Sequence, residues 1–286
     1  MKRLAMAMVI GAIAVGVWYG SPKRQENPIL KSAASPEPRN PPPITESNTS
    51  PAPLMQLAQS GTPAEVDALL SHLERTTDEA RRVELRQIIA SVFNRASEPH
   101  LIDRLANGTD PVAALGLQQA ILRMADLGTV ERLAARYDTA TDEGALRIAE
   151  IIERIDQPEC VLALARIASD PKVQSRDRLT LAALRALARI GTPFAAATLI
   201  RRLDAAPADE EAGLTSLIAS INRAGAQEDL IRSARGEQDA TRSVTRIAAI
   251  KALRNYRDAA TRSAVESLAK DADPRVAASA KASLQY

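Results

Sequence analysis

The feature that most constrains the fold of this 286-residue chain is an internal repeat. One unit consists of a helical stretch over 175–190, a turn at 191–193 that reads Gly-Thr-Pro, and a second helical stretch over 194–203. Apolar residues recur three and four positions apart in both stretches, which predicts one buried face on each helix. Glycine suits the end of a helix and proline suits the first turn of the next one. The unit is therefore predicted to be two helices joined by a tight turn.

The same plan recurs along the body of the chain with a period of about 32 residues. Periods of roughly 20–50 residues are typical of solenoids, in which each unit buries its apolar face only against its neighbours. We therefore predict an all-α solenoid over residues 54–286, with about six helix pairs and a partial unit at each end. The pairs are expected at 80–105, 111–135, 143–167, 175–203, 211–233 and 243–269, and a last helix at 275–284 has no partner after it.

The composition agrees with this prediction. Alanine supplies 54 of the 286 residues, whereas aromatic residues make up only 2% of the chain. Alanine is the best helix former, and strands favour β-branched and aromatic side chains. The composition therefore argues against a sandwich or a barrel, and it predicts a core built from small and aliphatic side chains without large rings.

The last predicted helix carries a motif that resembles a known family. Residues 273–284 read Asp-Pro-Arg-Val-Ala-Ala-Ser-Ala-Lys-Ala-Ser-Leu, which looks like the second-helix signature of HEAT repeats in the short form found in phycobilisome-lyase-like and bacterial HEAT proteins. The resemblance covers about residues 54–286. It implies a right-handed solenoid in which the helix after each aspartate lines the concave face, and it implies a binding scaffold more than any one reaction. Weaker matches lie at 242–249, 175–184, 110–115, which lacks the arginine, and 211–217.

The N-terminus has the pattern of an export signal. Residues 1–3, Met-Lys-Arg, precede an uncharged run of 17 residues over 4–20. A basic start before an apolar run is typical of secretory signals, and an uncleaved anchor needs about 17–25 apolar residues. Trp18 and Tyr19 at the far end favour the anchor, because aromatic residues gather at membrane interfaces. Cleavage after the small-x-small sequence at 12–14, Ala-Ile-Ala, stays open as the alternative.

This pattern predicts a single-pass protein of the bacterial inner membrane, with residues 1–3 in the cytoplasm and the body in the periplasm. If the segment is cleaved, the body is instead secreted to the periplasm. Residues 21–53 hold nine of the 17 prolines among polar side chains. Such a segment buries too little apolar surface to offset the entropy of ordering it, so we predict a disordered tether.

Residues that commonly carry chemistry are few and scattered. The chain has two histidines, His72 and His100, and one cysteine, Cys160, with no metal-ligand spacing among them. Cys160 lies in an apolar run and is expected to be buried, and His100 is expected at the surface start of a helix. Residues 61–286 hold 31 basic and 32 acidic side chains, which argues against a nucleic-acid-binding protein. We therefore expect no catalytic, cofactor or metal site and no small-molecule substrate.

Arginines mark the register of the repeat. An arginine is predicted to close each first helix, and a second arginine recurs 8–12 residues later. A cation at a helix C-terminus is favoured by the helix dipole, and pairing with carboxylates of the next repeat is a further structural role. The alternative is a row of anchors for an acidic partner, which fails if every guanidinium meets a carboxylate of a neighbouring repeat. The first set is Arg95, Arg123, Arg154, Arg189, Arg223 and Arg254, and the second is Arg104, Arg132, Arg166, Arg201, Arg232 and Arg262.

From these observations we predict a membrane-tethered scaffold for protein–protein interaction, facing the periplasm, without catalytic activity of its own. Two alternatives stay open. One is a chaperone or foldase that assists an exported protein, and the other is a lyase-like enzyme on a HEAT scaffold, which would need Cys160 or His100 in an open cleft. The expected partner is another protein, and the predicted partner-binding residues are Arg123, Arg154, Arg189, Arg223 and Arg254.

Overall fold

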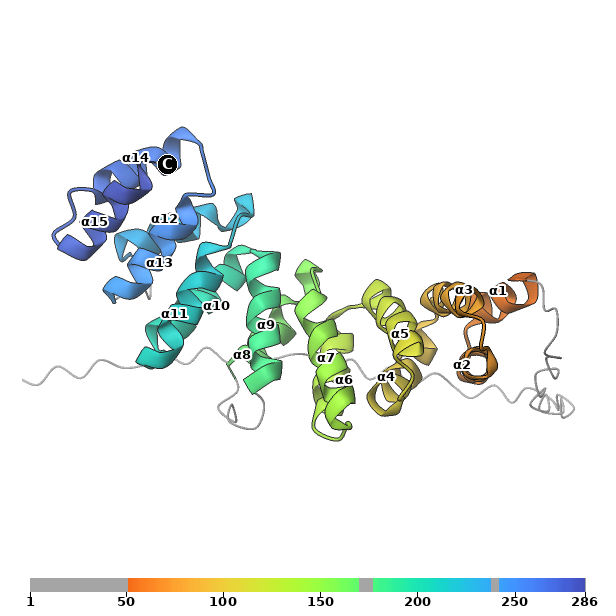
Figure 1. Ribbon diagram of the computed structural model, residues 1–286. Coiled ribbons are helices and arrows are strands. Elements are labelled where there is room, and N and C mark those ends of the chain that lie inside the picture. The colour runs from red at the N-terminus through yellow and green to blue at the C-terminus, as the bar shows by residue number, and fades with distance from the viewer. Residues whose placement is uncertain (1–50, 170–176, 238–241, 286) are drawn as a thin grey trace, which may run out of the picture. The chain divides into compact units, whose positions relative to one another are not determined.

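The structure, a computed structural model, describes residues 51–169, 177–237 and 242–285. Every regular element in these ranges is a helix, as the composition predicts (Figure 1). The predicted membrane segment, 4–20, and most of the predicted tether, 21–53, lie outside the described residues. The first helix begins at Pro51, so the folded body starts slightly before the predicted boundary at Leu54. Within the described ranges, no helix combines the length and the apolar character that a membrane crossing requires.

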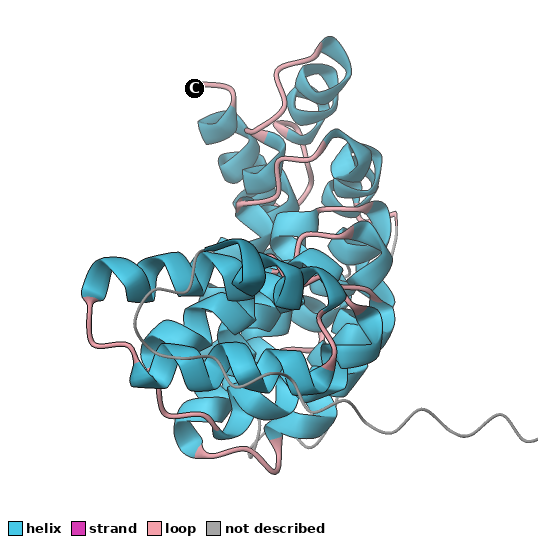
Figure 2. Ribbon diagram, turned by 90° about the vertical axis from the view of Figure 1, so that its right-hand side faces the viewer, coloured by secondary structure: helices cyan, strands magenta, loops and turns pink. Residues whose placement is uncertain are grey.

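The helices form two rows (Figures 1 and 2). Odd-numbered helices pack successively against one another in the first row, and even-numbered helices do so in the second row. Each second-row helix also packs against the first-row helix that follows it. The first row comprises α1 (Pro51–Ser60), α3 (Glu79–Ala90), α5 (Pro111–Met124), α7 (Asp142–Arg154), α9 (Asp177–Ile190), α11 (Ala208–Ala219), α13 (Ser243–Leu253) and α15 (Pro274–Ser283). The second row comprises α2 (Pro63–Arg75), α4 (Glu98–Asn107), α6 (Leu127–Tyr137), α8 (Val161–Ala168), α10 (Pro193–Asp204), α12 (Gln227–Arg235) and α14 (Ala259–Leu268).

This arrangement confirms the prediction of an all-α solenoid of helix pairs. The six predicted pairs all appear within the described part of the chain, and α1 and α2 form a further pair before them. At the other end, α15 follows the last pair as a single helix. Short 3₁₀ turns lead into three of the second-row helices, at Arg95–Ser97, Pro158–Cys160 and Ala224–Ala226.

One hydrophobic core runs through the stack from Leu54 to Ala280. Leucine, isoleucine, valine and alanine fill it together with Met124 and Cys160, and none of its buried members is aromatic. Phe93 and Phe194 are exposed instead, at 60% and 44% of their surface. Alanine lets neighbouring helices approach closely, which leaves no room for rings between the rows. The predicted aliphatic core is thus confirmed for the described residues.

Polar turn residues set the helix starts as predicted. Asp110 accepts hydrogen bonds from the backbone amides of Val112 (2.8 Å) and Ala113 (3.2 Å) at the start of α5. These bonds satisfy amides that have no partner inside the helix. Gly191 ends α9 with a φ of 56°, and a Cβ there would lie 2.9 Å from Cγ of Arg223. Both the left-handed backbone and the close approach require glycine at this turn.

Two first-row helices end earlier than predicted. The helix expected to reach Arg95 ends at Ala90, and the helix expected to reach Arg223 ends at Ala219. In both cases the next residue is a serine whose hydroxyl donates to the carbonyl three positions back, at 2.7 Å. Such local hydrogen bonds compete with continuation of the helix. Consequently Arg95 and Arg223 lie in the turns that follow, and Arg254 caps α13 from just beyond its end.

A third set of arginines, which the repeat pattern did not predict, joins helices of different pairs. Each lies at the start of a first-row helix and donates to carbonyls at the C-terminal end of a second-row helix. Arg82 donates to the carbonyls of Leu73 (3.1 Å) and Thr76 (3.2 Å), and Arg246 donates to that of Ala234 (3.0 Å). The last carbonyls of a helix lack the amide four residues on that would bond them inside the helix, so a guanidinium can take its place. The set is Arg82, Arg147, Arg242 and Arg246, and the same side chains pair with Asp110, Glu143, Glu211 and Asp271, respectively.

The pair between Arg246 and Asp271 should make stability depend on pH. The hydrogen bond from the Arg246 guanidinium holds the pKa of the Asp271 carboxyl below its ordinary value of 3.8. Since the folded-state pKa is the lower one, the stabilisation is complete above the unfolded-state pKa and is lost as pH falls through the folded-state pKa. We expect Arg246→Met to lower the free energy of unfolding by roughly 1.5–3 kcal/mol at neutral pH, and by less in acid. Urea unfolding of the full chain, followed by circular dichroism, measures both values.

Arg257 supplies the control, because it is exposed and forms no ion pair within the described residues. The variant Arg257→Met removes the same charge and should change the free energy of unfolding little at either pH. A loss for Arg246→Met that is equal at neutral and acidic pH would contradict the assigned role of Asp271.

Candidate functional site

Four of the five predicted partner-binding arginines have no carboxylate partner among the described residues. Arg95, the first arginine of the set that closes the first helices, forms an ion pair with Asp126 of the next helix pair. Within the part of the chain that the structure describes, Arg123, Arg154, Arg189 and Arg223 form no ion pair with a carboxylate, although all four are exposed. The condition that would have excluded a partner-binding role, pairing of every guanidinium with a neighbouring carboxylate, is therefore not met. Partner binding by these residues stays a prediction.

In the second arginine set, three members link neighbouring pairs and three do not. Arg104, Arg132 and Arg166 each reach a carboxylate of the preceding second-row helix, at 3.4, 2.7 and 2.7 Å. Their partners are Asp67, Glu98 and Glu131. Arg201, Arg232 and Arg262 instead contact groups of their own helices.

The predicted binding residues do not gather at one place. Arg123 lies over the ring of Phe93, 5.8 Å from its centroid, and donates to the carbonyl of Ala90 at 3.0 Å. Arg154 is in the last turn of α7. Arg254 donates to the Ser283 hydroxyl at 2.9 Å and lines a hollow of about 490 Å³ near the end of the chain. Arg189 and Arg223, in contrast, line a common hollow.

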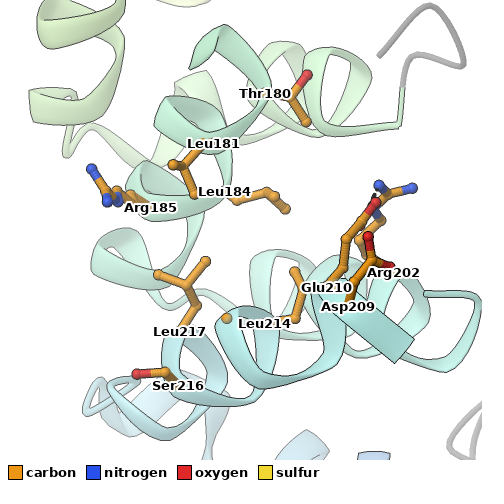
Figure 3. A pocket seen from close by; sticks show the side chains of 11 residues that line it. Thr180, Leu181, Leu184, Arg185, Arg202, Asp209, Glu210, Leu214, Ser216 and Leu217 are labelled. Carbon is orange, nitrogen blue, oxygen red and sulfur yellow. Dashed lines mark hydrogen bonds and ion pairs between the residues drawn. The ribbon is translucent and has the colours of Figure 1, made fainter. Parts of the chain in front are cut away.

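That hollow borders a second one, and we call the two together the α9–α11 groove. The second hollow, of about 570 Å³, lies between α9 and α11 (Figure 3). The hollow with Arg189 and Arg223 measures about 550 Å³ and shares Arg185 and Leu217 with it. The groove exists because α9 and α11 approach each other less closely than α7 approaches α9 or α11 approaches α13. Its walls are therefore two helix faces with space between them.

Leucines form the middle of the groove. Leu181 and Leu184 come from α9, and Leu214 and Leu217 come from α11 (Figure 3). Leu184 and Leu214 are almost fully buried, whereas 41% of Leu181 is exposed. Gly213 widens the groove, since a Cβ built there would meet no atom within 4 Å. An apolar floor with one exposed leucine costs free energy in water and favours an apolar ligand.

The exposed leucine recurs on neighbouring first-row helices. Leu115 on α5, Leu146 on α7 and Leu181 on α9 are 44%, 40% and 41% exposed. Each stands eight residues before a predicted binding arginine, so the same pairing of leucine and arginine appears on three successive helices. The exposure of these leucines was not predicted, because the apolar periodicity places all apolar residues of a helix on its buried face. Their fixed spacing from Arg123, Arg154 and Arg189 was the signal that could have shown them.

The two ends of the groove carry opposite charge. Arg185, Arg189 and Arg223 lie at one end with a single carboxylate, that of Glu153, which pairs with Arg185 at 3.0 Å. Figure 3 shows Asp209, Glu210 and Arg202 at the opposite end. There, Arg202 pairs with Glu210 at 2.7 Å. Arginines are thus in excess at one end and carboxylates at the other.

The residues with catalytic potential lie elsewhere. Cys160 is fully buried, and burial raises the pKa of its thiol to about 11. A thiol of this kind stays protonated, so it lacks the thiolate that a nucleophile needs. His100 lies in the first turn of α4, half-buried, with Nε2 2.9 Å from Oδ1 of Asp67. The described residues contain no group of three or more His, Cys, Asp or Glu side chains placed to hold a metal.

Comparisons with known proteins identify no family. No protein-family model matches the chain, and no curated protein matches it. Among solved structures, the chain is similar to human deoxyhypusine hydroxylase, in a complex with glycerol. The two are 18% identical, the match covers 81% of this chain and 87% of that chain, and the TM-score is 0.35. At these values the likeness supports no inference about the site or the reaction.

The similar structure nevertheless corrects one prediction. The repeat and the lack of catalytic motifs predicted that the chain is not an enzyme. The matched chain is a hydroxylase by its name, so the solved structure to which this chain is similar is that of an enzyme. The conclusion that helical repeats without familiar motifs have no catalytic activity is therefore withdrawn.

Proposed function

We propose that this chain is a scaffold for protein–protein interaction, tethered to the bacterial inner membrane through residues 4–20, with its body in the periplasm. The α9–α11 groove is its protein-binding surface. The observation that carries the proposal is the combination of an exposed leucine, Leu181, with two exposed arginines, Arg189 and Arg223, that have no carboxylate partner within the described residues.

The chemistry of the groove favours a protein as its ligand. Exposed apolar surface with a polar rim is typical of protein interaction sites. Arginine is enriched at the core of interfaces because its planar guanidinium binds carboxylates in pairs of hydrogen bonds and packs its stem on apolar surface. The groove provides both, since its leucines lie between Arg185 and the acidic end (Figure 3).

The tether rests on the N-terminal sequence. Two basic residues precede 17 uncharged residues, and a proline-rich stretch separates this run from the folded body. A segment of this length reaches the lower limit for an uncleaved anchor of about 17–25 residues. The proline-rich stretch then allows the body to work at a distance from the bilayer.

Photo-crosslinking in native membranes tests the proposal. A photoreactive residue replaces Leu181 in the full chain, and another replaces Leu162, which is 51% exposed on the second-row helix α8. We expect a covalent adduct with a protein from position 181 and none from position 162. Charge reversal by Arg189→Glu and Arg223→Glu should reduce the adduct on the order of tenfold or more, because each introduced carboxylate repels an acidic ligand.

The matched control reverses Arg201 and Arg232, two exposed arginines of second-row helices that do not line the groove. It makes the same change in net charge and should leave the adduct unchanged. Equal adducts from positions 181 and 162, or none from 181, would contradict the binding surface. The intact mass of the recovered chain tests the tether in the same experiment, since a chain that begins after Ala14 would contradict an uncleaved anchor.

A further inference from the structure

From the charges and the direction of the two helices that form the α9–α11 groove, we infer that the groove binds a second copy of this chain, related by a twofold axis, with α11 of one copy antiparallel to α11 of the other. This inference rests on the proposed function, because it identifies the ligand of the same surface.

The walls of the groove favour a helix as the ligand. Both walls are helices whose backbone groups already bond within their own helix, so they offer no row of free amides and carbonyls to an extended peptide. A buried extended segment would leave its own backbone groups unsatisfied. A helix satisfies its backbone internally and presents only side chains, which the leucines of the groove can receive.

The direction of the ligand follows from the ends of α9 and α11. Both helices start at the acidic end, since Thr180 and Asp209 lie there, and both run towards the arginine end, where Arg185 and Ser216 lie (Figure 3). Their C-termini carry partial negative charge, which favours the N-terminus of another helix beside them. A ligand helix therefore lies antiparallel to α9 and α11, and acidic residues in its first turn face the arginines.

Helix α11 itself meets these requirements. Its first turn carries Asp209, Glu210 and Glu211, and its exposed side includes the small residues Ala212, Gly213 and Ser216. Among these acids, Glu210 and Glu211 pair with arginines of their own copy, whereas Asp209 forms no ion pair within the described residues. An antiparallel second copy brings Asp209 to Arg189 and Arg223. The twofold axis makes this contact twice, as in other isologous interfaces.

The chain's own N-terminal residues are a poorer match. Residues 1–50 carry six basic and three acidic side chains, so they have the same sign of charge as the arginine end of the groove. The three acids, Glu26, Glu37 and Glu46, stand far apart and alternate with prolines, which disfavour a helix. A second copy, in contrast, carries three acids in one helical turn.

The contact surface is small. Stable interfaces bury about 1,200–2,000 Å² in total, and we expect a face formed by two helices of 14 and 12 residues to bury an area near the lower end of that range. We therefore expect a reversible dimer with a dissociation constant on the order of micromolar.

Disulfide crosslinking of the full chain in mild detergent tests the geometry. The only cysteine, Cys160, is fully buried and cannot form a disulfide at the surface. Any disulfide between two copies therefore comes from the introduced surface cysteine. If Asp209 of one copy faces Arg223 of the other, Ser216 lies halfway between them and faces itself across the axis. We expect Ser216→Cys to give a covalent dimer. Ala212→Cys and Ser220→Cys, four positions to either side and also exposed, should give a dimer only when the two variants are mixed.

Charge exchange provides the second measurement. In the Ser216→Cys background, Asp209→Lys should reduce the dimer severalfold, and Arg189→Glu with Arg223→Glu should do the same. All three changes in one chain restore opposite charges across the axis and should restore the dimer. Failure of this rescue, absence of the Ser216→Cys dimer, or equal dimers from all three single cysteines would overturn the inference. If position 181 crosslinks only to a different protein, the proposed binding surface stands and the second copy is excluded. If it crosslinks to none, both proposals fail.

Discussion

Replacing Gly144 with alanine is expected to lower the free energy of unfolding by about 3 kcal/mol or more. A Cβ at this position, in the first turn of α7, would lie only 1.9 Å from the carbonyl oxygen and 2.6 Å from the carbonyl carbon of Ala106. Both are backbone atoms near the end of α4, so no side-chain movement relieves the clash. The hydroxyl and the backbone amide of Thr141 donate to the same carbonyl oxygen, at 3.1 and 3.4 Å, and hold the two helices together.

Gly213→Ala is the matched control for this substitution. Gly213 also lies in a first-row helix, α11, but a Cβ there would meet nothing within 4 Å. Because alanine favours the helix over glycine, this variant should be more stable by up to about 1 kcal/mol. Urea unfolding of the full chain measures both changes. Equal effects of the two substitutions would show that the approach of α7 to Ala106 is not as close as described.

The second large effect is expected from Leu164→Ala in α8. Leu164 is fully buried in the continuous core, so the truncation removes apolar contacts and leaves a cavity. Such substitutions cost about 2–5 kcal/mol, depending on how far the surroundings relax. The midpoint of urea unfolding should therefore fall markedly, while the helical signal of the native state stays close to that of the original chain.

Leu162 gives a control two positions away in the same helix. It is 51% exposed, and surface substitutions of this kind usually change stability by about 0.5 kcal/mol or less. Leu162→Ala changes the helix propensity in the same way as Leu164→Ala, so the difference between the two variants isolates burial. If Leu162→Ala lowered the free energy of unfolding as much as Leu164→Ala, the side chain of Leu162 would have to be buried, contrary to the exposure described for it.

The starts of the helices were predictable, whereas several ends were not. Asp110 and Pro111 stand at the start of α5, and Gly191 and Pro193 at the turn from α9 to α10. Asp110 acts through hydrogen bonds to amides two or three positions away, and glycine and proline act through their own backbone angles. These effects are local, so they are visible in the sequence. The ends of α3 and α11 depend on Ser91 and Ser220, whose hydroxyls bond back to the helix. Serine also occurs within helices, so its type alone does not mark an end.

For the arginines, too, one property was predictable from the sequence and another was not. Their spacing predicted their places in the repeat, but not their partners. Arg95 meets Asp126 while Arg189 meets no carboxylate within the described residues, although both hold equivalent positions in the pattern. Arg82 and Arg246, which bridge to the carbonyls of another helix, carry no sequence mark that separates them from surface arginines. Pairing depends on residues about 25–40 positions away, at distances that no local pattern specifies.

By itself, the sequence determined an all-α repeat, an aliphatic core and the order of the helix pairs, because apolar periodicity and helix caps act within one turn or one unit. Only the tertiary structure decided where a ligand could bind. The groove depends on the wider spacing between α9 and α11, on the exposure of Leu181, and on which carboxylates reach which arginines. These are properties of neighbouring helices in contact. They could not be predicted from the sequence, because packing distances are set between helices and the sequence pattern describes each helix by itself.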